Sequence, residues 1–159
     1  MTRRFTPALA LAAALLLGGC AGRAFTATTY GPQALFGGYQ EKEIEPGIWR
    51  ITGNSNGPAG EGFGRNVALY RAAELIKGKG FSHFQVLDQQ GKTTMIGYGA
   101  PTSFAGETMK LTVRGVNDPA EPLVCRAKVP DHCATLSVET VMTTIGPQLA
   151  FRKNQGPAR

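Results

Sequence analysis

The first twenty residues constrain the fold most, because they determine which part of the chain folds and in which compartment. Arg3 and Arg4 form a basic start, and an unbroken run of Ala and Leu follows from Ala8 to Leu17. This order is typical of a secretory signal peptide. The run has ten residues, whereas a helix that spans a bilayer needs about 20. The sequence therefore predicts that residues 1–19 are a signal peptide and that the remainder folds after export.

The apolar run ends in Leu17-Gly18-Gly19-Cys20, which resembles the bacterial lipobox. In that motif small residues precede a cysteine whose sulfur receives a diacylglyceryl group before cleavage. Cys20 would become the acylated first residue, and two or three acyl chains anchor a protein stably without a transmembrane helix. The alternative is an ordinary signal peptide that leaves Cys20 as a spare thiol. By resemblance to enteric lipoproteins, Ala21 in place of Asp favours the outer over the inner membrane.

Composition divides the 140 residues that follow the predicted signal peptide into three parts. Residues 20–38 contain mainly Ala, Thr, Gly and Pro with little apolar periodicity, which predicts a lipidated N-terminus and a flexible tether. Residues 39–151 are long enough to form a single domain with its own core. Residues 152–159 are polar and basic, and we expect them to be a disordered tail.

The charge of the mature chain bears on its partners. Removal of the signal peptide takes away two arginines and no acid, so 15 Lys and Arg remain against 11 Asp and Glu, a net charge of +4. These cations are spread along the sequence without the aromatic interleaving that nucleic-acid binders show. The expected partners are therefore the bilayer, through acylated Cys20, and another envelope protein or the cell wall, but no nucleic acid.

Two cysteines remain once Cys20 is assigned to the lipid. Cys125 and Cys133 belong to an exported domain that meets an oxidising environment, so we predict that they form a disulfide. Pro130 and Asp131 lie between them and favour a turn, and a closed loop of about nine residues is stabilised by roughly 2.6 kcal/mol in the chain-entropy model. The alternative is a metal site with the adjacent His132, although no metal-type Cys-x-x-Cys or His-x-x-x-His spacing is present.

The pattern of apolar residues predicts an α+β domain. Asn66 can cap a helix that runs to about Lys77, with apolar residues at helical spacing, and Gly78 and Gly80 end it. Strands are expected at residues 48–52, 81–87, 93–98, 109–113 and 134–143, with a hairpin turn at Gln90-Gly91. The fold class is thus one main helix packed on a mostly antiparallel sheet.

No group of residues forms a catalytic constellation. The glycines of Gly60-Glu61-Gly62-Phe63-Gly64 do not follow the G-x-G-x-x-G spacing, and Glu61 would repel a phosphate. No nucleophile elbow of the form G-x-S-x-G is present. We therefore expect no enzymatic activity, no cofactor and no metal site.

The leading functional hypothesis is a non-enzymatic structural or interaction module that is anchored by lipid in the cell envelope and faces the periplasm. The alternative is a periplasmic small-ligand binder or enzyme that uses the glycine-rich loop Asn54–Gly64 with His83 or Arg71 nearby. Arg71 and Glu74 share one helix face and can form a surface ion pair.

Three sequence stretches carry a resemblance to a known family: I-E-P-G-I-W-R at residues 44–50, R-A-A-E-L at residues 71–75 and G-F-S-H-F-Q-V at residues 80–86. Together with the lipobox, they make the chain similar to a family of small, uncharacterised Gram-negative lipoproteins over about Tyr30 to Leu87. The resemblance implies a membrane-tethered envelope protein and assigns no catalytic residues.

Overall fold

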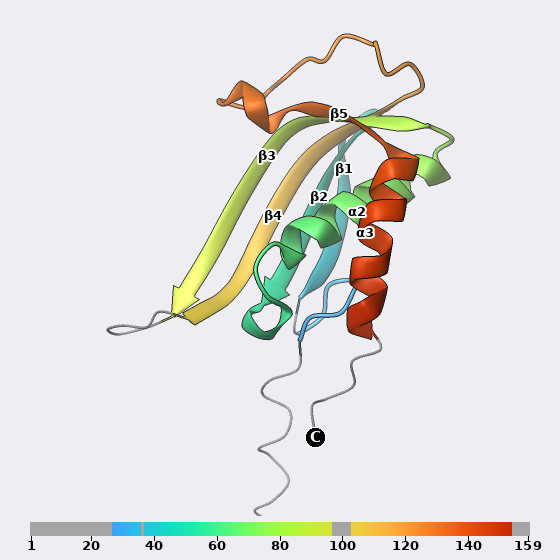
Figure 1. Ribbon diagram of the computed structural model, residues 1–159. Coiled ribbons are helices and arrows are strands. Elements are labelled where there is room, and N and C mark those ends of the chain that lie inside the picture. Colours follow the sequence, from blue (N-terminus) through green and yellow to red (C-terminus); the bar gives the residue numbers. More distant parts are fainter. Residues whose placement is uncertain (1–26, 36, 97–102, 154–159) are drawn as a thin grey trace, which may run out of the picture.

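The computed structural model describes residues 27–35, 37–96 and 103–153 (Figure 1). Its sheet has five strands in the order β1-β2-β4-β3-β5, and all neighbouring strands are antiparallel. The elements are β1 (Gly38–Glu45), β2 (Ile48–Asn56), the 3₁₀ turn η1 (Gly57–Ala59), α2 (Phe63–Gly78), β3 (His83–Ile96), β4 (Ser103–Val116), the 3₁₀ turn η2 (Pro130–His132), β5 (Ala134–Ser137) and α3 (Val138–Lys153). The predicted α+β class is confirmed.

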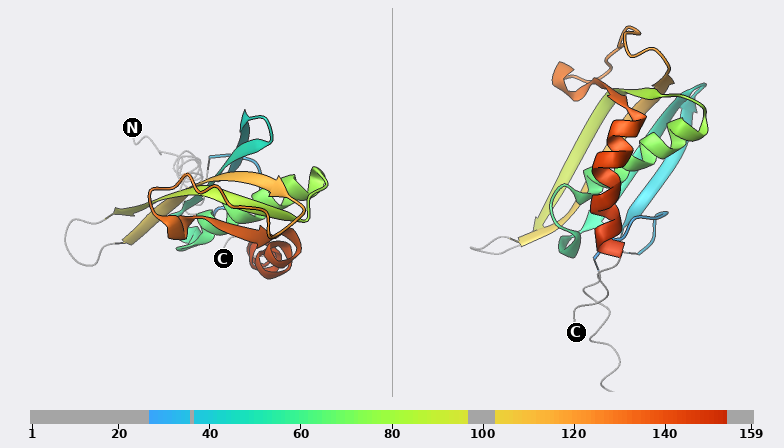
Figure 2. Two further views of the ribbon diagram at one scale, coloured as in Figure 1. Left: turned by 90° about the horizontal axis from the view of Figure 1, so that it is seen from above. Right: turned by 45° about the vertical axis from the view of Figure 1, so that its right-hand side comes forward.

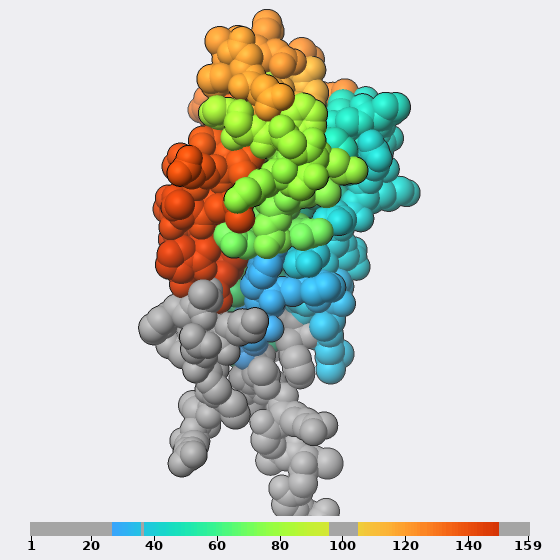
Figure 3. All heavy atoms as spheres, turned by 90° about the vertical axis from the view of Figure 1, so that its right-hand side faces the viewer, coloured from blue at the N-terminus to red at the C-terminus, as the bar shows by residue number. Residues whose placement is uncertain are grey.

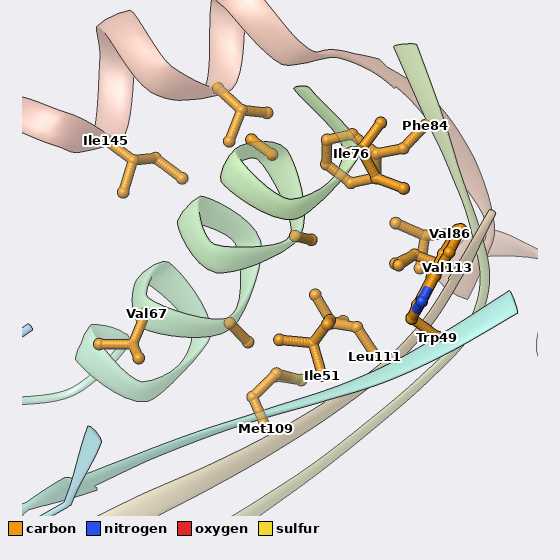
Figure 4. Packing of buried hydrophobic residues seen from close by; sticks show 14 of the residues in the cluster. Trp49, Ile51, Val67, Ile76, Phe84, Val86, Met109, Leu111, Val113 and Ile145 are labelled. Carbon is orange, nitrogen blue, oxygen red and sulfur yellow. The ribbon is translucent and has the colours of Figure 1, made fainter. Parts of the chain in front are cut away.

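Both helices lie on the same face of the sheet, so the molecule has a helix layer and a sheet layer (Figures 1 and 2). Side chains of a strand alternate between its two faces. In β2, Trp49 and Ile51 are buried whereas Arg50 is exposed. In the register of β2 with β4, Ile51 lies opposite Leu111, and both are fully buried beneath α2 (Figure 4). The core thus lies between the helices and one face of the sheet.

Helix α2 begins one turn earlier than the sequence predicted. Its N-cap is Gly62, with φ +78, and not Asn66. The difference follows from packing, because Phe63 in the first turn is buried in the core. At the other end, Gly80 has φ +87, and Phe81 N–H donates to Ile76 O over 3.2 Å. This is a Schellman ending, in which a left-handed glycine terminates the helix.

Close approach of α2 to the sheet depends on one glycine in β2. A Cβ atom at Gly53 would lie 2.2 Å from the carbonyl oxygen of Gly64 and 2.7 Å from the amide nitrogen of Ala68. Both atoms belong to the backbone of α2, which cannot move aside as a flexible side chain can. Gly53 therefore sets the distance between helix and sheet.

The second helix is a correction to the sequence prediction. The predicted strand at residues 134–143 is correct only as far as β5, because the chain continues as α3 from Val138. Its buried residues Val138, Val141, Ile145 and Leu149 recur at helical spacing and face α2 and the core. The β-branched residues of this segment and Pro147 favour a strand or a break locally, and tertiary burial outweighs that preference.

The predicted hairpin turn at Gln90-Gly91 is also wrong. Strand β3 continues through these residues to Ile96 and pairs with β4 along its length. Gly91 lies opposite Met109, and a Cβ atom at Gly91 would be 3.2 Å from the Met109 methyl group. The glycine therefore makes room for a core side chain inside a strand. Residues 97 and 98 of the predicted strand lie outside the described residues.

Residues before the predicted domain boundary at residue 39 also belong to the folded domain. Thr28 is only 1% exposed, and Tyr39 N–H donates to Gly31 O over 2.8 Å beside the start of β1. Residues 27–35 are therefore a structured segment, here named the N-terminal segment. Of the predicted tether and tail, residues 20–26, residue 36 and residues 154–159 lie outside the described residues, and α3 extends to Lys153.

The two ends of the sheet are occupied by different segments of the chain. The N-terminal segment, in blue, and the C-terminal end of α3, in red, lie at one end of the sheet (Figures 1 and 2). The connection between β4 and β5, in orange, lies at the opposite end, where it protrudes from the surface (Figure 3). The structure therefore places the N-terminal segment far from this connection.

Candidate functional site

Two regions combine unusual polar or exposed side chains with a fixed geometry: the attachment of the N-terminal segment and the connection between β4 and β5. The first begins with a reciprocal pair. Thr28 N–H donates to Asn56 Oδ1 over 2.9 Å, and Asn56 N–H donates to Thr28 Oγ1 over 2.9 Å. This exchange fixes the segment to the end of β2.

A cluster of aromatic and charged side chains holds the N-terminal segment against α2. The Tyr30 hydroxyl donates to a carboxylate oxygen of Glu74, and the Tyr30 ring lies edge-to-face with Tyr70 at a centroid distance of 5.1 Å. The Tyr30 ring also lies 5.2 Å from that of Tyr39. Burial and the hydrogen bond to Glu74 raise the pKa of the Tyr30 hydroxyl above its ordinary value. We name Tyr30, Tyr39, Tyr70, Arg71 and Glu74 the latch cluster.

Arg71 links the latch cluster to the edge strand. Its Nε and Nη2 donate to the two carboxylate oxygens of Glu41 over 2.6 and 3.0 Å, and its Nη1 donates to Glu74 over 2.9 Å. Its guanidinium carbon also lies 4.6 Å from the centre of the Tyr39 ring. The hydrogen bond to Glu41, followed by that to Glu74, raises the pKa of Arg71. The guanidinium is therefore held by side chains of β1 and α2, and Glu74 connects it to Tyr30 of the N-terminal segment.

The sequence predicted the Arg71–Glu74 pair, and the structure contains it. It did not predict the three tyrosines or Glu41 as its neighbours, because these come from different elements. The spacing offers one signal: Tyr39 and Glu41 are two residues apart, so in a strand they share a face. This shared face identifies Arg71 as the partner of Tyr39 and Glu41 only when the position of α2 is known.

The connection between β4 and β5 contains the predicted cysteine pair. Cys125 and Cys133 lie at disulfide distance, with Sγ atoms 2.11 Å apart and Cα atoms 5.6 Å apart. We name residues 117–133 the stapled loop. Arg126 at its centre forms a two-bond ion pair with Glu45, over 2.6 and 2.9 Å, which lowers the pKa of Glu45. Arg126 N–H also donates to Leu87 O over 2.7 Å.

The first half of the stapled loop covers one end of the sheet face that the helices leave open. Gln85, fully buried, donates to Glu121 O over 2.8 Å and accepts from Arg114 over 2.8 Å. Arg114 also forms an ion pair with Glu121 over 3.0 Å. The loop is thus fixed to the sheet by hydrogen bonds on its inner side.

The stapled loop exposes three large apolar side chains. Leu123, Val124 and Val129 are 36%, 62% and 46% exposed. Leu123 and Val124 directly precede Cys125, and Val129 lies between the two cysteines. The loop that contains them, in orange, protrudes in Figure 3. A fixed loop with exposed apolar side chains is typical of a contact surface for another molecule.

The glycine-rich segment Asn54–Gly64, the candidate ligand loop, has a structural role in this fold. It contains the end of β2, the turn η1 and the start of α2, and its residues Ala59 and Phe63 are buried in the core. Gly64 N–H donates to the Glu107 carboxylate over 3.1 Å. Within the described residues, neither Arg71 nor His83 is hydrogen-bonded to this segment.

The histidines do not form a catalytic arrangement in the part of the chain that the structure describes. His83 Nδ1 lies 2.9 Å from the hydroxyl of the adjacent Ser82, and no carboxylate is hydrogen-bonded to its ring there. Nor do the described residues contain a group of three or more His, Cys, Asp or Glu that could hold a metal ion. His132 lies in η2, beside Cys133 of the disulfide.

Among the described residues, no helix is both long enough and apolar enough to cross a membrane. Comparison of the chain with protein-family models, with curated proteins and with solved structures finds no match. The latch cluster and the stapled loop are therefore the two regions whose geometry bears on function.

Proposed function

We propose that this protein is a lipid-anchored lipoprotein of the bacterial cell envelope, of the lipoprotein family that its motifs resemble, and that it acts as a non-enzymatic interaction module. The observation that carries the proposal is the arrangement of the two ends. The described chain starts at one end, seven residues after Cys20, and a fixed loop with exposed apolar residues lies at the other (Figure 1).

The short link to Cys20 supports the anchoring part of the proposal. Seven peptide units separate Cys20 from Ala27, and an extended chain spans at most about 3.3–3.6 Å per residue, hence about 25 Å in total. Thr28 and Tyr30 are already bonded to the domain. An acylated Cys20 would therefore hold the whole domain close to the bilayer, in the periplasm and preferentially at the outer membrane.

The stapled loop supports the interaction part. A partner that buries Leu123, Val124 and Val129 gains the hydrophobic free energy of their covered surface. The cysteine pair and the Arg126–Glu45 ion pair already hold the loop in one conformation. Less conformational entropy is then lost on binding, which favours association. The expected partner is another envelope protein with an apolar patch.

Replacement of Cys20 by Ser in the full-length protein tests the anchor. We expect the wild-type protein to be acylated and to lie in the membrane fraction, whereas the Cys20→Ser protein should carry no acyl chains. Metabolic labelling with a palmitate analogue measures the acylation. A matched control is Cys125→Ser with Cys133→Ser, which should keep the label. Equal labelling and equal membrane retention of Cys20→Ser and wild type would overturn the proposal.

Site-specific crosslinking in intact cells tests the contact surface. A photoreactive amino acid at Val124 should give a discrete crosslinked product, and the same group at the exposed Lys77 of α2 provides the control. Leu123→Ser in the same chain should weaken the Val124 product, because it removes apolar contact area. Products of equal yield from both positions would argue against the loop as the contact surface.

A further inference from the structure

The face of the sheet opposite the helices gathers basic side chains that are far apart in the sequence. Lys42 lies opposite Arg50 in the pairing of β1 with β2. Lys110 of β4 lies opposite Thr52 of β2. Lys92 of β3 lies opposite Thr108 of β4. Four strands thus contribute to one basic surface, which we name the cationic face: Lys42, Arg50, Lys92 and Lys110.

Alternation along each strand shows that these side chains leave the sheet on the open side. Arg50 stands between buried Trp49 and Ile51, and Lys110 stands between buried Met109 and Leu111. Lys92 follows Gly91, whose missing Cβ would point at the Met109 side chain in the core. Neighbouring residues of a strand point to opposite faces. All four basic side chains are exposed.

Lys42 is placed by the same reasoning. The preceding residue, Glu41, contacts Arg71 of α2 and therefore points toward the helix layer. Lys42 must then point to the open face, beside Arg50.

The positive charge of this face is not neutralised by the rest of the domain. Within the described residues, none of the four cations forms an ion pair, whereas Arg114 on the same face is paired with Glu121. The described strands place two acidic residues on the open face: Glu45, which lies opposite Ile48 and is neutralised by Arg126, and Asp88, which accepts a hydrogen bond from Gln90 over 2.8 Å. The face thus carries a net charge of about +3 before any partner binds.

Between the cations the open face is polar and presents hydrogen-bond donors. Thr52, Thr108 and Gln90 separate the basic residues, and a hollow of about 560 Å³ borders Lys42 and Arg50 where the N-terminal segment meets β1. Gln33 and Gln40 supply amide groups to the rim of this hollow. Thr108 already donates to Asn54 and Gln90 to Asp88, so the lysine and arginine side chains are the main donors that suit an array of phosphate groups.

We propose that the cationic face docks on an anionic phospholipid surface, so that the domain lies with its sheet on the bilayer. The proposal rests on the lipid anchor proposed above, because the anchor supplies the membrane. Asn56, which holds Thr28, lies six residues from Arg50 on β2, a distance of about 20 Å along the strand. The cationic face is therefore adjacent to the point where the chain would leave the membrane.

Two features make a bilayer the best occupant. The charge is complementary to anionic headgroups, and each basic residue near such a surface strengthens binding by roughly fivefold. The link of at most about 25 Å from Cys20 also keeps the face within reach of lipid at a high effective concentration. In this orientation the helices face away from the membrane, and the stapled loop, which covers the opposite end of the open face, borders the area in contact with lipid.

Vesicle binding of the unlipidated protein tests this inference separately from the anchor. The mature chain, residues 20–159, is produced with Cys20→Ser so that no acyl chain contributes, and all described contacts are retained. We expect it to sediment with vesicles of equal parts phosphatidylcholine and phosphatidylglycerol at low salt. Binding should be lost with vesicles of phosphatidylcholine alone and at high ionic strength, where charges are screened.

A matched pair of charge-reversal variants assigns the binding to the cationic face. Lys42→Glu with Arg50→Glu should weaken vesicle binding at least tenfold. Arg65→Glu with Lys77→Glu makes the same change of net charge on exposed positions of α2 and should weaken it by no more than about threefold. Circular dichroism should show that both variants keep the fold, since all four side chains are exposed.

Three results would overturn the inference while leaving the anchor intact. They are no binding to the anionic vesicles, an equal loss in both variants, and binding to heparin or single-stranded DNA with no binding to vesicles. Conversely, if Cys20→Ser leaves acylation and membrane retention unchanged in cells, the proposed function fails, whereas the vesicle result stands by itself as a property of the sheet face.

Discussion

The two faces of one sheet have opposite chemistry although they are built from the same strands. On β4, Leu111 is buried under α2, whereas its neighbour Lys110 is exposed on the open face. On β2, Ile51 and Arg50 show the same contrast. Figure 4 shows the apolar side chains that gather on the helix side. Adjacent residues thus serve separate purposes: one face holds the fold together and the other is available for binding.

This division teaches where mutations should act. Substitutions on the helix side remove buried area and change the free energy of unfolding. Substitutions on the open side leave the core intact and change what the surface can attract. The substitutions below test this contrast.

The largest effect is expected for Leu111→Ala, which removes a fully buried side chain from the helix side. It should lower the free energy of unfolding by about 2–5 kcal/mol, because a cavity replaces packed methyl groups. Lys110→Ala, one residue away on the open face, should change it by less than about 0.5 kcal/mol. Urea unfolding followed by tryptophan fluorescence measures both, and equal losses would contradict the division into two faces.

Loss of the disulfide should have the next largest effect. Cys125→Ser with Cys133→Ser should reduce the free energy of unfolding by roughly 2.6 kcal/mol, because the unfolded chain regains the entropy of an open loop of about nine residues. Since the stapled loop covers only an end of the open face, helix content should be unchanged by circular dichroism. If the variant is as stable as the wild type, the bond between Cys125 and Cys133 does not stabilise the fold.

A pair of glycine variants probes the helix side at one level of the sheet. Gly53 and Gly91 both lie opposite Met109, on either side of β4. Gly53→Ala should destabilise by about 1–3 kcal/mol, because its Cβ meets the backbone of α2. Gly91→Ala meets only the end of the flexible Met109 side chain, and we expect a change of at most about 1 kcal/mol. Thermal unfolding ranks the two, and the reverse order would refute the role of Gly53.

A smaller effect is expected at the latch cluster. Tyr30→Phe removes a hydrogen bond to Glu74 and should cost about 1–2 kcal/mol near neutral pH. The folded protein raises the pKa of Tyr30, so this contribution is present below the ordinary tyrosine pKa of about 10 and is lost as the pH rises above it. The stability difference between wild type and Tyr30→Phe should therefore shrink from pH 9 to about pH 11. If urea unfolding gives the same difference in free energy of unfolding at pH 9 and pH 11, the ionisation of Tyr30 is not coupled to folding.

The sequence was sufficient for features that depend on neighbouring residues. The strand through Trp49 and Ile51 follows from alternation, the Schellman ending of α2 from Gly80, and the pairing of Cys125 with Cys133 from the expected export of the domain. Each of these rests on local chemistry that a short stretch of chain contains. The α+β class follows from the sum of such stretches.

Features that depend on tertiary contact were not predicted from the sequence. Val138 and Val141 favour a strand by propensity, yet they belong to α3 because its apolar stripe packs against α2. Gly91 signals a turn in isolation, yet it makes room for Met109 in a continuous strand. The basic residues of the open face are dispersed in the sequence, and only the pairing register brings Lys42 and Arg50 together.

The outer edge of β1 has a consequence for how copies of this protein behave when crowded. A free strand edge is a template for the strand of another molecule, and such pairing leads to aggregation. Here the start of β1 is already paired with Gly31 and Gln33, and the remainder carries the alternating charges of Lys42, Glu43 and Glu45. At the other border, β5 has only four residues. The border formed by β1 therefore offers little free edge with which a second copy could pair.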